Sequence, residues 1–479
     1  MATEYEPVIG LEIHAQLATR TKLFCGCATD FGGPPNSNVC PVCLGLPGTL
    51  PAINEKAVRL GVRAALALGC SINQRSIFAR KNYFYPDLPK GYQISQYELP
   101  FSQHGRIDFE VDGATFSAGI TRVHLEEDAG KNLHGIQGAS AIDLNRAGTP
   151  LIEIVGEPDL RSSEQAAAYM RAVREILMAI GVNDGNMEEG SFRCDANVSL
   201  RPKGSERFGT RVELKNINSF KFVQRAISVE IARQTAILDA GGQVQQETRS
   251  FDPSTSKTAT LRSKEDAHDY RYFPDPDLPA LEIDAATIEQ ERALVGELPE
   301  ARRQRYVRDW SLTRAQATTL CQHPGTVRFF EDVLRQFDEP VKVANFVLTE
   351  VLRGARFHGL AAEFTVSPTQ VAELLELVES GKISGKQAKE VFALVEAEPG
   401  ASPRAIVEQR GLAVVSDASA LETILKDLMQ KNPKQVASIR AGKTNVVGFF
   451  VGQVMKATNG SADPKLVSEL LTRLLAESD

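Results

Sequence analysis

The periodicity of the apolar residues changes once along this chain, at the proline-rich segment RYFPDPDLPALEID, residues 271–284. Before it, stretches such as GLEIHAQL alternate between apolar and polar residues, as a half-buried β-strand does. After it, apolar residues recur at helical spacing. Because the strands of the first part do not alternate regularly with helices, the pattern favours an α+β fold with a largely antiparallel sheet.

The length of 479 residues is too great for a single hydrophobic core. We expect three domains: a strand-rich domain over residues 1–292, a helical domain over 293–408 and a small helical tail over 409–479. The second boundary follows the break EAEPGASPRAIVEQRGL, which contains prolines and glycines.

The composition excludes some classes of protein. No apolar run reaches the roughly 18 residues that a membrane helix needs. The start, MATEYEPVIG, lacks the basic head and apolar run of a secretory signal, so we expect a cytoplasmic protein. The formal net charge of -7 argues against a surface that binds nucleic acid everywhere, but it permits local basic patches.

The first predicted strand raises a question about its polar face. Leu11 and Ile13 would lie on one face, and Glu12, His14 and Gln16 on the other. A solvent-exposed strand often carries Glu and His together, and so does a strand that holds a metal ion. The alternation alone leaves both interpretations open.

Further acidic residues lie on other predicted strands of the same domain. In TRVHLEEDAGK, His124, Glu126 and Asp128 would share one face, with Glu127 opposite. Glu153 lies within an apolar run, where an unpaired buried carboxylate would be costly. Such a set suits one or more Mg²⁺ ions that hold nucleotide phosphates, although each acid alone could simply be solvated. The stretch NMEEGSFRCDANVSL adds Glu188, Glu189, Arg193, Asp195 and Asn197.

The known phosphate-binding loops are absent from the sequence: it contains neither G-x-x-x-x-G-K-[ST] nor a strand–G-x-G-x-x-G–helix unit. Any ATP site must therefore belong to another fold type. The stretch RKNYFYPDLPKGYQISQYE offers Lys81 for a phosphate and Tyr83 for stacking on a base. The alternative is a proline-turned loop with amphipathic tyrosines.

Four cysteines, Cys25, Cys27, Cys40 and Cys43, form the pattern C-x-C, twelve residues, C-x2-C. Two close pairs on turns rich in Gly and Pro predict a tetrahedral Zn²⁺ site over residues 25–43. Four thiolates leave no open coordination position, so the zinc would be structural. The alternative is four unrelated buried thiols.

Two basic clusters lie in the helical part, and each could follow an RNA backbone or be an ordinary solvated helix face. The segment that holds the tail cluster, residues 426–456, contains one acid, Asp427. The first cluster comprises Arg302, Arg303, Arg305 and Arg308, and the tail cluster comprises Lys426, Lys431, Lys434, Arg440, Lys443 and Lys456.

Several long motifs resemble the B-subunit family of the aspartyl/glutamyl-tRNA amidotransferases, in order and along the whole chain: VIGLEIHAQL, KNYFYPDLPKGYQISQ, HLEEDAGK, DLNRAGTPLIEIV, EEGSFRCDANVSLRP, ELKNINSF and DYRYFPDPDLP. KTNVVGFFVGQVMKATNG resembles the family's tail. The resemblance implies a glutamine-synthetase-like cradle domain. It also implies an enzyme that works in a heterotrimer with an amidase (the A subunit) and a small third protein (the C subunit). Such an enzyme phosphorylates the side chain of Glu-tRNA(Gln) or Asp-tRNA(Asn) with ATP and amidates it with glutamine-derived ammonia. The sequence leaves open whether a non-discriminating aminoacyl-tRNA synthetase joins such a complex.

The resemblance also implies roles for individual residues. Glu12 and His14 match the family's metal-binding pair, and Glu126 and Glu127 match its second carboxylate pair, both for Mg²⁺. Lys81, Tyr83 and Arg193 are expected to bind the nucleotide, while Glu153, Glu189 and Asp195 complete the acidic site. The cysteine set varies in the family, so the chemistry does not require zinc. The competing hypotheses are a free-standing ligase of the glutamine synthetase type and a zinc-bearing RNA-binding or chaperone module.

Overall fold

The computed structural model describes residues 4–136, 139–263, 270–412, 418–440, 446–458, 462 and 464–477. Contacts divide the chain into two compact units, Met1–Arg302 and Arg303–Asp479, which are described one at a time. The α+β class with a mainly antiparallel sheet is confirmed. Among the described residues, no helix combines the length and apolar character that crossing a membrane requires.

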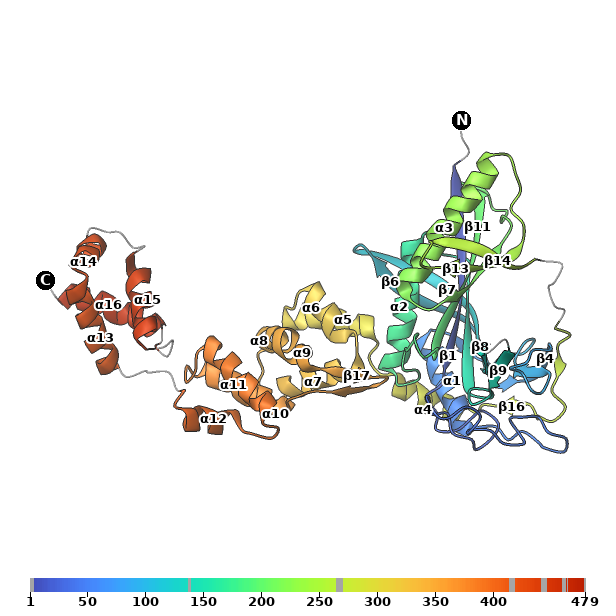
Figure 1. Cartoon of the computed structure of the whole chain (residues 1–479), viewed down its shortest axis with the longest axis horizontal. Coiled ribbons are helices and arrows are strands. Elements are labelled where there is room, and N and C mark those ends of the chain that lie inside the picture. Colours follow the sequence, from blue (N-terminus) through green and yellow to red (C-terminus); the bar gives the residue numbers. More distant parts are fainter. Residues whose placement is uncertain are drawn as a thin grey trace. The chain divides into compact units, whose positions relative to one another are not determined.

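A nine-stranded sheet forms the centre of the first unit (Figure 1). Its strands, in order across the sheet, are β14 (Lys257–Ser263), β13 (Glu247–Asp252), β12 (Val212–Ile217), β11 (Phe192–Pro202), β1 (Tyr5–Gln16), β10 (Pro150–Gly156), β7 (Ala114–Glu127), β6 (Ser102–Val111) and β2 (Ser71–Ile72). All neighbours are antiparallel except β12 and β13.

The two faces of this sheet differ in polarity. Leu11 and Ile13 of β1 and Ile152 and Ile154 of β10 lie in the main hydrophobic core. The amphipathic helices α1 (Glu55–Ala67), α2 (Ser163–Ala179) and α3 (Phe220–Asp239) contact the strands on this side. Each fully buried Leu or Ile stabilises the fold by about 1.5–3 kcal/mol. The alternate residues of the same strands therefore lie on the opposite face, which carries the polar side chains.

A small three-stranded sheet packs against the end of β7. It consists of β15 (Phe273–Pro274), β4 (Ala79–Asn82) and β5 (Tyr92–Ser95). The Gln93 amide donates a hydrogen bond to the Glu127 carbonyl at 2.6 Å, and the Leu125 amide donates to Gln96 Oε1 at 3.1 Å. The proline-rich segment therefore contributes to the first unit: it supplies β15 and also β16 (Leu281–Glu282), which pairs with β3 (Arg75–Ser76).

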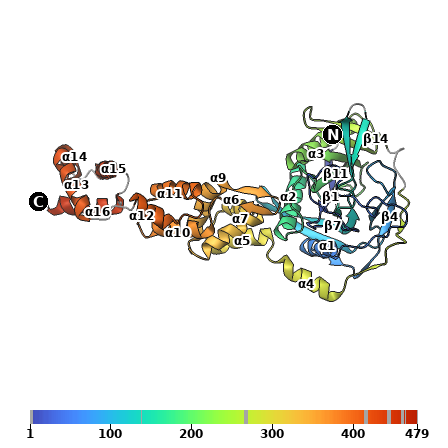
Figure 2. The ribbon, with the colours of Figure 1, turned by 60° about the horizontal axis from the view of Figure 1, so that its bottom comes forward.

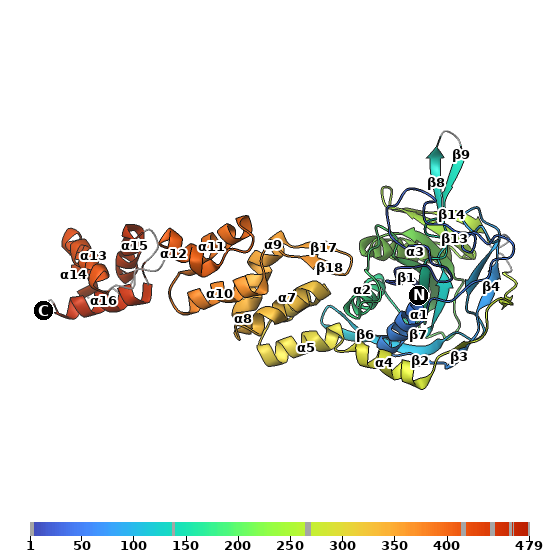
Figure 3. The same cartoon turned by 90° about the horizontal axis from the view of Figure 1, so that it is seen from below.

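Two further elements complete the first unit. Helix α4 (Ala285–Val295) contacts α1, and the buried carboxylate of Glu291 accepts a hydrogen bond from Arg63 at 2.9 Å. The hairpin of β8 (Lys131–Ile136) and β9 (Ala139–Asp143) projects from the unit (Figure 3).

Within its described residues, the second unit is helical apart from the short pair β17 (Arg356–His358) and β18 (Ala361–Glu363). It holds one hydrophobic cluster around Phe330 and Phe392 and another around Phe450. Helices α10 and α11 lie side by side (Figure 2). The ranges 1–292, 293–408 and 409–479 stay a prediction. The helices are α5 (Pro299–Trp310), α6 (Arg314–Cys321), α7 (Pro324–Leu334), α8 (Pro340–Phe346), the π-helix η2 (Val347–Val351), α9 (Leu352–Gly354), α10 (Pro368–Glu379), α11 (Gly385–Ala397), α12 (Pro403–Arg410), α13 (Ala418–Lys431), α14 (Pro433–Arg440), α15 (Val447–Ala457) and α16 (Pro464–Glu477).

Candidate active site

The strand register places four polar residues in one row across the polar face of the main sheet. Arg193 of β11 lies opposite His14 of β1, His14 opposite Glu153 of β10, and Glu153 opposite His124 of β7. Directly opposed residues of neighbouring strands project to the same face of a sheet. The four side chains therefore line one surface, although they come from positions up to 179 residues apart in the sequence.

Residues two positions along the strands extend this row. Glu12 of β1 lies opposite Asp195 of β11, and Glu126 of β7 lies opposite Leu151 of β10. Glu12 and Glu126 are thus on the same face as His14, while Ile13 lies on the core side and is fully buried. The polar side of the first strand belongs to this row of acids and is not a freely solvated surface.

Two groups of potential metal ligands share Glu153. The Nε2 atom of His14 lies 3.8 Å from Glu12, 3.7 Å from Glu126 and 3.6 Å from Glu153. The Nε2 atom of His124 lies 3.5 Å from Glu153 and 3.8 Å from Glu126. Within each of the groups Glu12–His14–Glu153 and His124–Glu126–Glu153, the ligand atoms lie within 4.8 Å of one another. Carboxylate oxygens at this spacing suit Mg²⁺ that also binds phosphates and water.

The crowding of these groups changes their pKa values. Burial, followed by the negative charge of Glu153, raises the pKa of Glu12 to about 7. Burial alone would lower the pKa of His14, but the hydrogen bond and the charge of Glu153 raise it to about 9. Burial likewise opposes ionisation of Glu153, yet His124 and His14 hold its pKa well below the usual range.

The small sheet places a lysine and tyrosines beside this row. Burial would lower the pKa of Lys81, on β4, but the nearby Glu126 and other groups raise it above its ordinary value. The Lys81 ammonium also lies 5.0 Å from the ring centre of Tyr270, and the Tyr83 ring meets Tyr270 edge to face at 5.8 Å. Ser95 of β5 donates a hydrogen bond to Glu126 at 3.2 Å.

A cavity of about 580 Å³ opens over this surface. Of the predicted site residues, the structure brings Glu12, His14, Lys81, Tyr83, Glu126, Arg193 and Asp195 to its lining, with Glu153 in contact with His14.

Three functional candidates lie here that are not among the individually predicted site residues. The sequence pattern places His124 and Asp128 in a set that suits Mg²⁺ but gives neither a role of its own, and it does not distinguish Lys215 from the rest of its motif ELKNINSF. Asp128 accepts hydrogen bonds from Gln16 at 2.7 Å and Arg193 at 2.9 Å. Burial would raise the pKa of Asp128, but the charges of Arg193 and Arg146 lower it. Asp128 thus fixes the position of Arg193.

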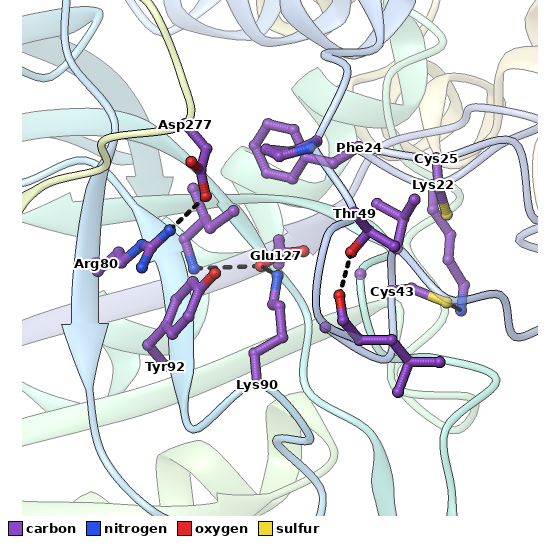
Figure 4. Close-up of a pocket in the computed structure, with 16 residues that line it drawn as sticks. Lys22, Phe24, Cys25, Cys43, Thr49, Arg80, Lys90, Tyr92, Glu127 and Asp277 are labelled. Carbon is purple, nitrogen blue, oxygen red and sulfur yellow. Dashed lines mark hydrogen bonds and ion pairs between the residues drawn. The ribbon is translucent and has the colours of Figure 1, made fainter.

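Two predicted residues are not brought to this cavity. Glu127 points to the other side of β7, where it pairs with Lys90 and accepts a hydrogen bond from the Ile94 amide at 3.2 Å. Both side chains line a second cavity of about 220 Å³, seen in Figure 4. Glu126 and Glu127 therefore lie on opposite faces of β7, as adjacent strand residues do, and the assignment of both to Mg²⁺ stays a prediction. Glu189 is exposed in the turn before β11.

The four cysteine sulfur atoms lie within 4.8 Å of one another, as a tetrahedral Zn²⁺ site requires. The Cys40 amide donates to the Cys43 sulfur at 3.1 Å, and the ammonium of buried Lys22 lies 3.6 Å from the same atom. A hydrogen bond from Cys25, among other groups, lowers the pKa of Cys43 to about 4. The residues present therefore suit a structural zinc ion.

The two basic clusters differ in how far acids neutralise them. In the first, Arg302 pairs with Glu297, Arg305 with Glu331, and Arg308 with Asp309. In the tail, Lys426 pairs with Glu422 and Lys431 with Asp427. Lys434 and Lys456 are exposed and have no ion pair within the described residues. Lys443 and the side chain of Arg440 lie outside the described part.

Known proteins and family models match this chain along nearly its whole length. Residues 7–289 match the family model of the GatB/GatE catalytic domain, and residues 328–475 match that of the GatB domain. The B subunit of the aspartyl/glutamyl-tRNA(Asn/Gln) amidotransferase from Solidesulfovibrio magneticus is 53% identical over 473 residues, covering 98% of this chain and 99% of its own. Those of Geobacter sp. strain M21 and Geobacter sulfurreducens are 54% and 53% identical, with the same coverage.

Divalent-ion binding at the two ligand groups should strengthen as the pH rises. A His ligand must be neutral, and His14 with a pKa of about 9 is mostly protonated at neutral pH. We expect Mn²⁺ affinity, measured by electron paramagnetic resonance, to rise about fiftyfold between pH 7 and 9, because the neutral fraction of His14 rises from about 1% to about 50% over this range.

The opposite orientations of Glu126 and Glu127 give this measurement a matched pair of variants. E126Q should lose Mn²⁺ affinity at least tenfold, because a ligand and a negative charge are removed. E127Q should bind Mn²⁺ as the wild type does, but it should be less stable by about 3 kcal/mol in denaturant unfolding, because Lys90 is left buried without its partner. Equal losses of Mn²⁺ affinity in both variants would contradict this placement.

The cysteine cluster predicts about one zinc ion per chain. C43S should lower the zinc content measured by mass spectrometry well below that level and reduce the melting temperature. C321A, which removes a buried cysteine of the second unit, should leave the zinc content unchanged. Zinc retained at full level by C43S would rule out the four-cysteine site.

Proposed function

The chain belongs to the B-subunit family of the aspartyl/glutamyl-tRNA amidotransferases, and we propose that it phosphorylates the side-chain carboxylate of Glu-tRNA(Gln), Asp-tRNA(Asn) or both with ATP, so that glutamine-derived ammonia can form the amide. The observation that carries this proposal is the row Arg193–His14–Glu153–His124. Two of its members, Arg193 and His14, line a cavity of about 580 Å³ together with Lys81, a volume typical of ligand sites.

The chemistry explains why such a site needs no nucleophilic side chain. A carboxylate is a poor electrophile, so one of its oxygens first attacks the γ-phosphorus of ATP, and ADP leaves. Ammonia then attacks the acyl carbon, and inorganic phosphate leaves with the former carboxylate oxygen while a proton is lost. Both steps depend mainly on positioning and on neutralising charge.

The side chains of the site divide between these tasks. Glu12, His14, Glu126, His124 and Glu153 would hold magnesium in one or two positions. Magnesium bound there supplies charge neutralisation for the phosphate oxygens. Glu153 belongs to both ligand groups, so it would hold magnesium in either position.

The cations would act on the nucleotide directly. Lys81 and Arg193 are placed to meet phosphate oxygens, and Tyr83 offers a ring to the nucleoside. Arg193 is well suited to this because Asp128 orients its guanidinium. Asp195 completes the acidic surface. Glu189, on the exposed turn, would act only if that turn moves toward the cavity.

The remaining parts of the chain would serve recognition and assembly. We assign residues 1–292 to a glutamine-synthetase-like cradle, 293–408 to a helical domain and 409–479 to a tail that binds tRNA. The amidase and the small third protein of the heterotrimer would supply the ammonia, and a non-discriminating aminoacyl-tRNA synthetase could deliver the mischarged tRNA. The zinc ion would stabilise residues 25–43 without entering the reaction.

A free-standing ligase for small amino acids is not favoured. The relatives match over 98% of the chain, helical parts included, and their names describe one part of a tRNA amidotransferase. A ligase for a free amino acid would have no use for the tail.

Removal of a metal ligand tests the reaction. In the complete complex, E12A and E126A should abolish ATP-dependent phosphorylation of Glu-tRNA(Gln), monitored by the release of labelled phosphate, while tRNA binding in a filter assay stays within twofold. E110A serves as the control, because Glu110 is an exposed acid on β6 of the same sheet. Full phosphorylation by both variants would refute the metal assignment.

Charge reversal in the tail tests tRNA recognition. Deletion of residues 409–479 should abolish tRNA binding. K434E/K456E should weaken it and reduce the slope of log affinity against log salt by about one for each lysine. The control K382E/K386E makes the same change of charge on exposed residues of the helical region. If both double variants lose the same affinity, the tail is not the binding surface.

A further inference from the structure

Lys215 is a second lysine on the polar face, at the end of the acidic row opposite to Lys81. It lies on β12, where Leu214 is buried in the core and the residues on either side therefore project to the polar face. Lys215 lines the same cavity as Glu12 and Asp195. In the strand order β12–β11–β1–β10–β7, Lys215 lies at the β12 end, whereas Lys81 lies on β4 of the small sheet, whose neighbouring strand β5 contacts β7 at the other end.

The ammonium of Lys215 has one donor to spare. It pairs with Asp195 at 2.5 Å and with Glu213 at 3.0 Å. Glu213 is itself fixed by a hydrogen bond from Thr248 at 2.7 Å. An ammonium group carries three N–H donors, and these two carboxylates take two of them. The side chain keeps 31% of its surface exposed, toward the cavity that it lines.

This arrangement holds the Lys215 ammonium in a defined position and leaves it able to donate another hydrogen bond. Two carboxylates orient the ammonium, and the side chain lines a cavity that an anionic ligand can enter. Phosphoryl transfer spreads negative charge over three equatorial oxygens of the γ-phosphate, so a second cation across from Lys81 neutralises oxygens that Lys81 does not reach.

We propose that Lys215 is a catalytic residue that donates a hydrogen bond to the γ-phosphoryl group of the nucleotide during its transfer. The proposal rests on the proposed phosphorylation for its catalytic part. Its ligand-binding part, a preference for a γ-phosphate, is independent of which acceptor is phosphorylated.

The test compares two nucleotides that differ only in the group Lys215 would contact. The complete complex is titrated with Mg²⁺ and either ADP or a non-hydrolysable ATP analogue, for the wild type, K215M and the control K203M. Lys203 lies on the loop after β11, and its ion pair with Glu4 is exposed. K215M should bind the ATP analogue about ten- to a hundredfold more weakly, the effect of losing a charge-assisted hydrogen bond, and ADP within twofold of K203M.

Lys215 could bind either the γ-phosphate or the acceptor carboxylate, and steady-state kinetics distinguish these two ligands. K215M should lower kcat for phosphorylation at least a hundredfold with KM for the mischarged tRNA unchanged. A raised KM for that tRNA, with the preference for the ATP analogue intact, would overturn the proposal in favour of the carboxylate. Equal weakening of ADP and ATP-analogue binding would reduce Lys215 to a structural role.

The role of Lys215 can still be decided if K215M does not fold or if the wild-type complex is inactive. If K215M does not fold, K215Q, which retains hydrogen-bond donors toward Asp195 and Glu213 without the charge, gives the same comparison. If the wild-type complex itself does not phosphorylate a mischarged tRNA, the proposed function fails, but the comparison of ADP with the ATP analogue still decides whether Lys215 binds a γ-phosphate.

Discussion

The buried carboxylate of Glu153 is the constraint on which the rest of the site depends. It lies on the central strand β10 between Ile152 and Ile154, which are fully buried, and only 6% of Glu153 itself is exposed. An unpaired carboxylate there would cost several kcal/mol. The antiparallel register offsets this cost, because it places His14 on one side of Glu153 and His124 on the other. A slip of one residue on either strand would bring an apolar side chain to Glu153 and leave its charge uncompensated.

The same strands contribute apolar residues to the core on one face of the sheet and polar residues to the site on the other. Helices α1, α2 and α3 bury the apolar face, so the strands are held firmly by packing that the site does not disturb. The small sheet then approaches the polar face from the other side and contributes Lys81. Rigid strands position charged groups more accurately than loops do, which matters where catalysis depends mainly on electrostatic positioning.

Part of this could be predicted from the sequence, because alternation decides which residues share a face. It correctly separated Glu126 from Glu127 and grouped Glu12 with His14. It could not give the register between strands far apart in the chain, and only the register brings Arg193 to His14. The carboxylate pair inferred from family resemblance stays a prediction, and the structure shows that Glu127 pairs with Lys90 on the face opposite to Glu126. Lys215 escaped notice because an alternating strand such as VELKNI looks like any other half-buried strand. The proline-rich segment predicted an end of the strand-rich region, yet it adds β15 and β16, because proline is tolerated on short edge strands.

The balance of charge in the cavity connects protonation to cation binding. Glu12, Glu126, Asp128 and Asp195 line it and Glu153 adjoins it, whereas its fixed cations are Lys81, Arg193 and Lys215. The acids therefore outnumber the cations. Burial, followed by the charge of Glu153, raises the pKa of Glu12, and the hydrogen bond and charge of Glu153 raise that of His14, so both shifts favour the protonated forms. A divalent ion would compete with these protons for the same lone pairs. Under the proposed metal assignment, the acidic row would exchange protons for a metal ion, and Asp128, whose pKa is lowered by its own arginines, would stay outside that exchange.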